Sequence, residues 1–192
     1  MTTDIAALIG SRICHDLISP IGAIGNGVEL LAMSPSVGPS AELDLITQSV
    51  QNANARIRFF RIAFGAAKGT DQIGTQEIVS VLTEIAKGGR FTFDWQVQGP
   101  MSRRDVRLAF LLIQCIETAL PLGGDMQVTQ HDDDWTITAH GRRVMIDDAL
   151  WNSLHGAPYE HKPAQVQFAY VPTVAQRAIT VSHTDANITI RF

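Results

Sequence analysis

The chain has 192 residues, of which 45% are apolar, and a formal net charge of −4. That length and apolar content suffice for one ordinary domain, or two small ones, with a real core. The negative charge and a pI near 5.8 exclude a basic field for nucleic acid and a polybasic anchor for a membrane, so we expect protein partners.

Residues 13–31 predict the first helix of a hairpin. Their apolar positions are spaced by three and four and therefore lie on one stripe of the helix. These residues are Ile13, Leu17, Ile21, Ile24, Val28 and Leu31. The pattern ends at residues 34–39, which have the composition of a turn, and Ser40 is a suitable N-cap for a second helix.

The second helix repeats the rule over three heptads, with Leu43, Ile46, Val50, Ala53, Ile57, Phe60 and Phe64. Two helices cannot bury both stripes together with the further apolar residues Leu30, Leu45, Phe59 and Ile62. We therefore expect a homodimer in which two hairpins form a four-helix bundle.

After residue 70 the sequence changes character, and short helices alternate with strand-like stretches. The predicted helices lie at residues 75–87, 102–120 and 164–176. The predicted strands lie at residues 91–97, 126–130, 135–139, 179–181 and 188–190, with polar turns at 131–134 and 184–186. This interleaving predicts a two-layer α+β sandwich over residues 71–192, after a helical hairpin over residues 1–70.

The segment around His15 carries the main chemical signal. An acid, Asp16, follows it, and Pro20 stands five residues further on. At 100° per residue His15 falls about 160° from the apolar stripe, on a face with the small or polar residues Ser11, Arg12, Ser19, Gly22 and Asn26. We expect the imidazole to be accessible to another protein, although spacing alone leaves open a merely solvated histidine.

Pro20 is unusual in this helix. Proline costs about 3 kcal/mol in a helix interior, so something other than helix stability keeps it there. Because it lacks an amide donor, we expect it to bend the helix or to free the carbonyl of Asp16.

Residues 15–20, His-Asp-Leu-Ile-Ser-Pro, resemble the H-box of histidine kinase dimerisation domains. The longer string over residues 11–27 resembles the ChpT-type bacterial histidine phosphotransferases. That family pairs a dimeric helical hairpin with a degenerate ATPase-like domain. The resemblance implies that residues 1–70 are a dimerisation and histidine phosphotransfer hairpin, and that residues 71–192 have the Bergerat fold of kinase ATPase domains without its ATP site.

The kinase boxes that bind ATP are altered here. Residues 114–119, Gln-Cys-Ile-Glu-Thr-Ala, match the N-box, and Thr118 stands where a kinase has its magnesium-binding asparagine. The stretches at 140–143 and 165–170 lack the glycines whose amides cradle phosphates. We expect no ATP-dependent kinase activity and no cofactor or metal ion on this chain. Glu117, left within the altered box, is interpreted as an orphaned helix residue.

The resemblance implies that His15 is the phosphoacceptor and that Asp16 binds its other ring nitrogen and orients it. The phosphoryl group would come from a receiver-domain aspartate and pass to another receiver, the partners being receiver domains of a hybrid histidine kinase and of response regulators. Mg²⁺ would be on the receiver. The alternative is a non-catalytic module that binds response regulators and keeps a vestigial His15; an active ATP-dependent kinase ranks third.

Counting along the hairpin places basic side chains beside His15. If the turn centres near Val37, residue 15 lies opposite about residue 59, so Arg56, Arg58 and Arg61 come to its level. Receiver sites are acidic, and these arginines, with Arg12, are candidates for steering such a partner. The alternative is that they offset the helix dipole and stay solvated.

Other signals are weaker. No run of about 18 apolar residues occurs, and residues 1–4 lack the positive region of a signal peptide, which predicts a cytoplasmic protein. We expect free buried thiols at Cys14 and Cys115 and core positions for Trp135 and Trp151. A solvated turn is expected at residues 132–134. No metal-ligand spacing joins His131, His140, His155, His161 and His183.

Overall fold

The computed structural model describes residues 5–34, 40–66, 71–87 and 89–192, without the side chains of residues 5, 7–9, 11, 12 and 16. The helices are α1 (Ile5–Ala32), α2 (Ala41–Phe64), α3 (Thr75–Ala86), α4 (Arg103–Ala119), α5 (Asp148–Asn152) and α6 (Val166–Val174), with short 3₁₀ turns at Ser153–His155 and Pro163–Gln165. The strands are β1 (Gln72–Gly74), β2 (Phe91–Trp95), β3 (Pro100–Ser102), β4 (Gly124–His131), β5 (Asp134–Gly141), β6 (Thr180–His183) and β7 (Asn187–Arg191).

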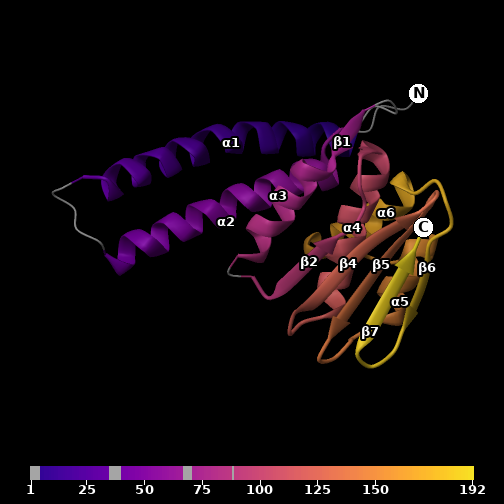
Figure 1. Cartoon of the computed structure of the whole chain (residues 1–192). Helices are drawn as coiled ribbons and strands as arrows, with labels where there is room; N and C mark the ends of the chain where they lie inside the picture. The colour runs from indigo at the N-terminus through magenta and orange to yellow at the C-terminus, as the bar shows by residue number, and fades with distance from the viewer. Residues whose placement is uncertain (1–4, 35–39, 67–70, 88) are drawn as a thin grey trace.

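Helices α1 and α2 form a long antiparallel hairpin that extends beyond the rest of the molecule (Figure 1). The N-cap prediction at Ser40 is confirmed, because its hydroxyl accepts a hydrogen bond from the amide of Leu43. The two helices approach closely at Gly10, where an added Cβ would lie 2.9 Å from the carbonyl oxygen of Phe64. The predicted hairpin turn lies largely at residues 35–39, outside the described residues.

The C-terminal part is built on a five-stranded sheet of order β2-β4-β5-β7-β6. Strand β2 pairs with β4 in parallel, and the other neighbours are antiparallel. Helices α4 and α6 lie behind the sheet in Figure 1, and its opposite face is open. The predicted fold, a helical hairpin followed by a two-layer α+β sandwich, is confirmed.

One hydrophobic core joins the hairpin to the sheet layer. Phe59 of α2 is buried with its ring centroid 4.6 Å from that of Phe110 on α4, and Ile62 is buried beside it. The expectation that Phe59 and Ile62 need a second copy for burial is therefore wrong, because α3 and α4 already cover this face of α2. The domain boundary predicted near residue 70 falls outside the described residues.

Several short elements were not expected from the sequence. Strands β1 and β3 form a separate two-stranded antiparallel sheet, and α5 is a five-residue helix. The predicted turn at residues 131–134 is shorter, because β4 and β5 continue to His131 and from Asp134, and Asp132 takes a positive φ of 53° between them. In the described part of the chain, no helix combines the length and the apolar character that a membrane span requires.

Candidate functional site

His15 lies on the surface of α1, nearly three turns after the helix begins at Ile5. Its side chain is exposed, whereas the neighbouring Cys14 is buried against α2. Ser19 and Asn26 are also exposed, and Gly22 is half-buried, so these members of the predicted face share one side of the helix with His15. This placement agrees with the helical phase calculated from the apolar stripe.

Three predicted site residues have side chains outside the described set: Ser11, Arg12 and Asp16. Their backbones belong to α1, which places Ser11 and Arg12 one turn before His15. The hydrogen bond expected between Asp16 and the imidazole remains a prediction.

Pro20 lies inside α1 without ending it, since the helix continues from Ile5 to Ala32. Proline has no amide hydrogen, so the Asp16 carbonyl one turn earlier receives no helical hydrogen bond from it. The helix therefore continues past Pro20, and the Asp16 carbonyl, which lacks this hydrogen bond, lies next to the candidate phosphoacceptor His15.

A groove between α1 and α2 continues from the His15 face toward the hairpin turn. It has a volume of about 120 Å³, and small or polar residues form much of its lining, including Gly22, Asn26, Gln51 and Asn54. Gly25 forms its floor, where an added Cβ would lie 3.3 Å from a methyl carbon of Val50. Larger residues in α1 would fill this groove.

The arginines of α2 lie at the predicted level but face the C-terminal part. The contacts of Gly10 with Phe64 and of Gly25 with Val50 put residue 15 opposite residues 59 and 60, which confirms the hairpin count. Three contacts join α2 to α3 and α4: Arg56 to Glu117 at 3.8 Å, Arg58 Nη2 to Ser80 Oγ at 3.3 Å, and Arg61 to Glu77 at 3.6 Å. This geometry favours a role in joining the two parts, and partner binding by Arg56 and Arg58 stays a prediction.

Both cysteines are buried and free, as expected. Burial raises the pKa of the Cys14 thiol, and the nearby guanidinium of Arg61 lowers it by less. Burial also raises the pKa of Cys115 well above its ordinary value. A buried thiol with a raised pKa is a poor nucleophile, so Cys14 is no competitor to the adjacent imidazole.

Glu117 is not orphaned, which corrects the sequence interpretation. It pairs with Arg56 across the seam between α2 and α4. Burial raises the pKa of Glu117, and the coulombic effects of Arg56 and Arg90 lower it by less. The neighbouring Thr118, at the position of the kinase asparagine, donates its hydroxyl hydrogen to the Cys115 carbonyl at 2.7 Å.

The stretches compared with the kinase glycine boxes form ordinary secondary structure. Gly141 ends β5 and packs against Leu120, and residues 166–170 belong to α6. Among the residues with a described backbone, positive φ occurs at Asp132, Gly99, Gly123 and Gly156, none of them in these stretches. The searched residues contain no group of three or more His, Cys, Asp or Glu that would hold a metal ion.

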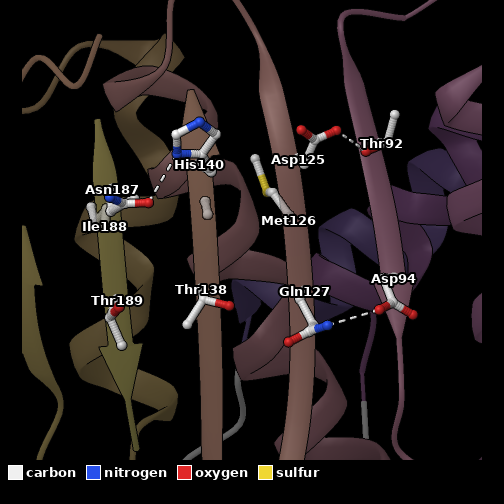
Figure 2. Close-up of a pocket in the computed structure, with 11 residues that line it drawn as sticks. Thr92, Asp94, Asp125, Met126, Gln127, Thr138, His140, Asn187, Ile188 and Thr189 are labelled. Atoms are coloured by element: carbon white, nitrogen blue, oxygen red, sulfur yellow. Dashed lines mark hydrogen bonds between the residues drawn. The ribbon is translucent and has the colours of Figure 1, made fainter. Parts of the chain in front are cut away.

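The open face of the sheet carries a cavity of about 440 Å³ (Figure 2). Polar side chains from neighbouring strands line it, and Figure 2 shows Gln127 donating to Asp94 and the ring of His140 beside Asn187. Its lining includes none of the predicted site residues. The tryptophans are core residues as predicted, with Trp135 and Trp151 both buried.

Comparison with known proteins gives the family. A family profile described as histidine phosphotransferase C-terminal domain matches residues 75–187. The protein phosphotransferase ChpT of Brucella abortus (strain 2308) is 34% identical over 184 residues, which cover 91% of this chain and 87% of that protein. The chain belongs to the histidine phosphotransferase family.

A solved structure of a bacterial phosphotransferase has the same fold as this histidine phosphotransferase. It aligns with a TM-score of 0.69 and 30% identity, over 100% of this chain and 97% of its own. A histidine kinase domain from Erythrobacter litoralis EL346 aligns over 90% of this chain and 94% of its own, with 14% identity and a TM-score of 0.48. The family assignment confirms the resemblance seen in residues 11–27.

Proposed function

We propose that this phosphotransferase works in a phosphorelay, with His15 as the residue that carries the phosphoryl group. The observation that supports this most is the exposed imidazole on a helix surface whose neighbours, Ser19, Gly22 and Asn26, are small or polar. A receiver domain brings a buried aspartyl phosphate to its partner, so the accepting side chain must stand clear of bulky neighbours.

The phosphoryl transfer balances when His15 reacts as a neutral imidazole. The unprotonated ring nitrogen of His15 attacks phosphorus, the bond from phosphorus to the aspartate oxygen breaks, and the receiver regains its carboxylate. The reverse sequence on a second receiver returns the imidazole. Asp16 would accept a hydrogen bond from the other ring nitrogen and so keep the attacking nitrogen unprotonated.

Charge neutralisation at the phosphoryl group is expected to come from the receiver. Phosphoryl transfer depends on positioning and on cations that offset charge on the equatorial oxygens. We assign Mg²⁺ to the receiver and no cofactor to this chain. Arg12, one turn before His15, remains a candidate for an additional cation at the transferred group.

The groove between α1 and α2 supports a docking position for the receiver beside His15. Gly22 and Asn26 line both the His15 face and the groove, so a partner seated on the imidazole also reaches Gln51 and Asn54 of α2. The receivers of a hybrid histidine kinase and of response regulators fit this surface because each brings the same acidic phosphorylation site. We place this exchange in the cytoplasm.

A homodimer is proposed from the apolar outer face of the hairpin. Ile13, Ile24 and Leu31 of α1 are 53%, 50% and 53% exposed in one chain, and the nearby Leu30 and Met33 are 70% and 79% exposed. Apolar stripes of this length are covered in stable proteins, and a second hairpin offers the matching stripe. Leu45, Ile46 and Phe60 extend the exposed stripe onto α2.

The assignment of His15 is tested by label transfer from a receiver domain phosphorylated with ³²P. The wild-type protein should take up the label, and His15→Ala should not. His131→Ala is the matched control, because that imidazole is almost fully exposed at the end of β4. Label on His15→Ala equal to the wild type would refute the proposal and leave a non-catalytic docking role for His15.

A further inference from the structure

A second cavity, of about 320 Å³, opens where the hairpin meets the C-terminal part. Three charged residues from different segments line it: Arg56 of α2, Arg90 before β2, and Glu117 near the end of α4. The remaining lining residues, Ile85, Gly89 and Phe91, are apolar or small. This cavity is separate from the groove beside His15.

The guanidinium groups of Arg56 and Arg90 have N–H donors available for further hydrogen bonds. The Glu117 oxygen nearest to Arg56 is 3.8 Å away, too long for a hydrogen bond. The Arg90 guanidinium lies over the Phe91 ring at 5.4 Å and forms no ion pair or hydrogen bond within the described parts of the chain, whereas its backbone carbonyl accepts a hydrogen bond from the amide of Gly124. Each guanidinium carries five N–H donors, in a planar arrangement that suits oxyanions.

Glu117 favours an anion when it is protonated. Its side chain is only 16% exposed, and burial raises the pKa of the carboxyl despite the two charged groups that face it, Arg56 and Arg90. A protonated carboxyl donates a hydrogen bond and carries no charge that would repel an oxyanion. The cluster then has two positive charges and a neutral acid.

Several carbonyl groups at the end of α4 already accept hydrogen bonds. The donors are Thr118 Oγ1 and the amides of Leu120 and Met145. The apolar lining from Ile85 and Phe91 lowers the local dielectric, which strengthens any contact between a guanidinium and an anion.

We propose that this cavity is a binding site for a small tetrahedral oxyanion, inorganic phosphate, held by the guanidinium groups of Arg56 and Arg90, with the side chain of Glu117 beside it. Because Arg56 belongs to the hairpin and Arg90 to the C-terminal part, the bound ion joins the two and stabilises their contact. The site is independent of the role proposed for His15.

The experiment is calorimetric titration of the full chain at constant ionic strength. Sulfate is the first probe, since its charge is constant between about pH 5.5 and pH 8, whereas phosphate titrates in this range. Wild-type protein should bind sulfate, and the binding should weaken over the pH range in which Glu117 loses its proton, because burial raises the pKa of this carboxyl. Inorganic phosphate at about pH 7 should compete with sulfate.

Variants separate this site from general charge effects. Arg90→Gln should weaken sulfate binding by about tenfold or more. Glu117→Gln should keep binding and lose its pH dependence, because the amide donates at every pH. Lys87→Gln is the matched control, since Lys87 pairs with Glu84 on α3 outside the cavity. His15→Ala should also bind as the wild type does.

Two results would overturn the proposal. The first is a heat of binding in the sulfate titration that is no larger than the heat measured with chloride at the same ionic strength. The second is an equal loss in Arg90→Gln and Lys87→Gln, which would mean that net charge alone governs the effect. Neither result bears on label transfer to His15, so the two proposals fail separately.

Discussion

In the C-terminal part, the apolar side chains of the sheet and of α4 are withdrawn from solvent, with Ile113 and Ile137 fully buried. On the outer face of the hairpin, by contrast, Ile13 and Ile24 remain about half exposed. The first region completes its core within one chain, and the second does not. The exposed imidazole of His15 lies in the second region.

The two faces of α2 have different surroundings. The inner face of α2 packs on α3 and α4 through Phe59 and Ile62, while the adjacent Phe60 points away from it and is 38% exposed. The C-terminal part covers the inner face of α2 through α3 and α4.

The largest effect is expected from Phe59→Ala. This side chain is 1% exposed and packs on Phe110, so its removal leaves a cavity between α2 and α4 and should lower the free energy of unfolding by about 3 to 5 kcal/mol. Urea denaturation measures it. The adjacent Phe60→Ala, on the 38% exposed outer face, should cost about 1 kcal/mol or less at low protein concentration. Equal losses would contradict the division between faces.

Ile24→Asp should break the proposed dimer while leaving the chain folded. A carboxylate in the apolar stripe would have to be desolvated between two hairpins, so we expect the dimer dissociation constant to rise by about 100-fold or more. Sedimentation velocity over a range of concentrations measures it. Val79→Asp, at a 39% exposed position on α3, is the control that should leave the dimer intact. A monomeric wild-type protein would end the dimer proposal.

Arg107→Met tests a hydrogen bond that links α4 of the C-terminal part to the end of α2 in the hairpin. Arg107 is buried on α4, donates to the carbonyl of Gly65 at the end of α2, and lies 5.9 Å from the ring centroid of Tyr170. The variant leaves that carbonyl without its donor and should cost about 1 to 3 kcal/mol in unfolding free energy. Arg104→Met, at an exposed position on the same helix, should have almost no effect on the free energy of unfolding. An equal loss of stability in this variant would show that the hydrogen bond from Arg107 does not stabilise the contact.

Glu117→Gln should have the smallest effect on the free energy of unfolding, under about 1 kcal/mol. The size of this effect should depend on pH. Burial raises the pKa of Glu117 in the folded state, so the native protein holds this proton at pH values where the unfolded chain has lost it. Stability should therefore fall as the pH rises from the ordinary glutamate pKa through the raised one. Glu117→Gln should lack this component in denaturation curves at about pH 4.5 and 7.5, and the exposed Glu160→Gln should keep it.

Features set by local sequence were predictable. Spacing by three and four gave the helices of the hairpin, the hydroxyl of Ser40 gave the start of α2, and the helical phase gave the exposure of His15. The level of the α2 arginines followed from counting residues outward from the turn predicted near Val37. Each of these depends on residues that are near one another in the chain.

Features set by contacts between distant segments were not predictable. The pair of Arg56 and Glu117 joins residues that only the docking of α4 on α2 brings together. The same docking buries Phe59 and Ile62, which periodicity alone assigned to a dimer. Strands β1 and β3 have three residues each, too few for an alternating pattern, and pair only because α3 and β2 return the chain.

The most direct test of the account is to locate the phosphoryl group on the wild-type protein after incubation with a phosphorylated receiver. Mass spectrometry that preserves acid-labile phosphate should find it on the peptide containing residues 11–20, attached to His15. The label should leave that peptide when a second, unphosphorylated receiver is added. Phosphate on any other residue, or none on His15 while the second receiver still becomes phosphorylated, would contradict the role assigned to His15.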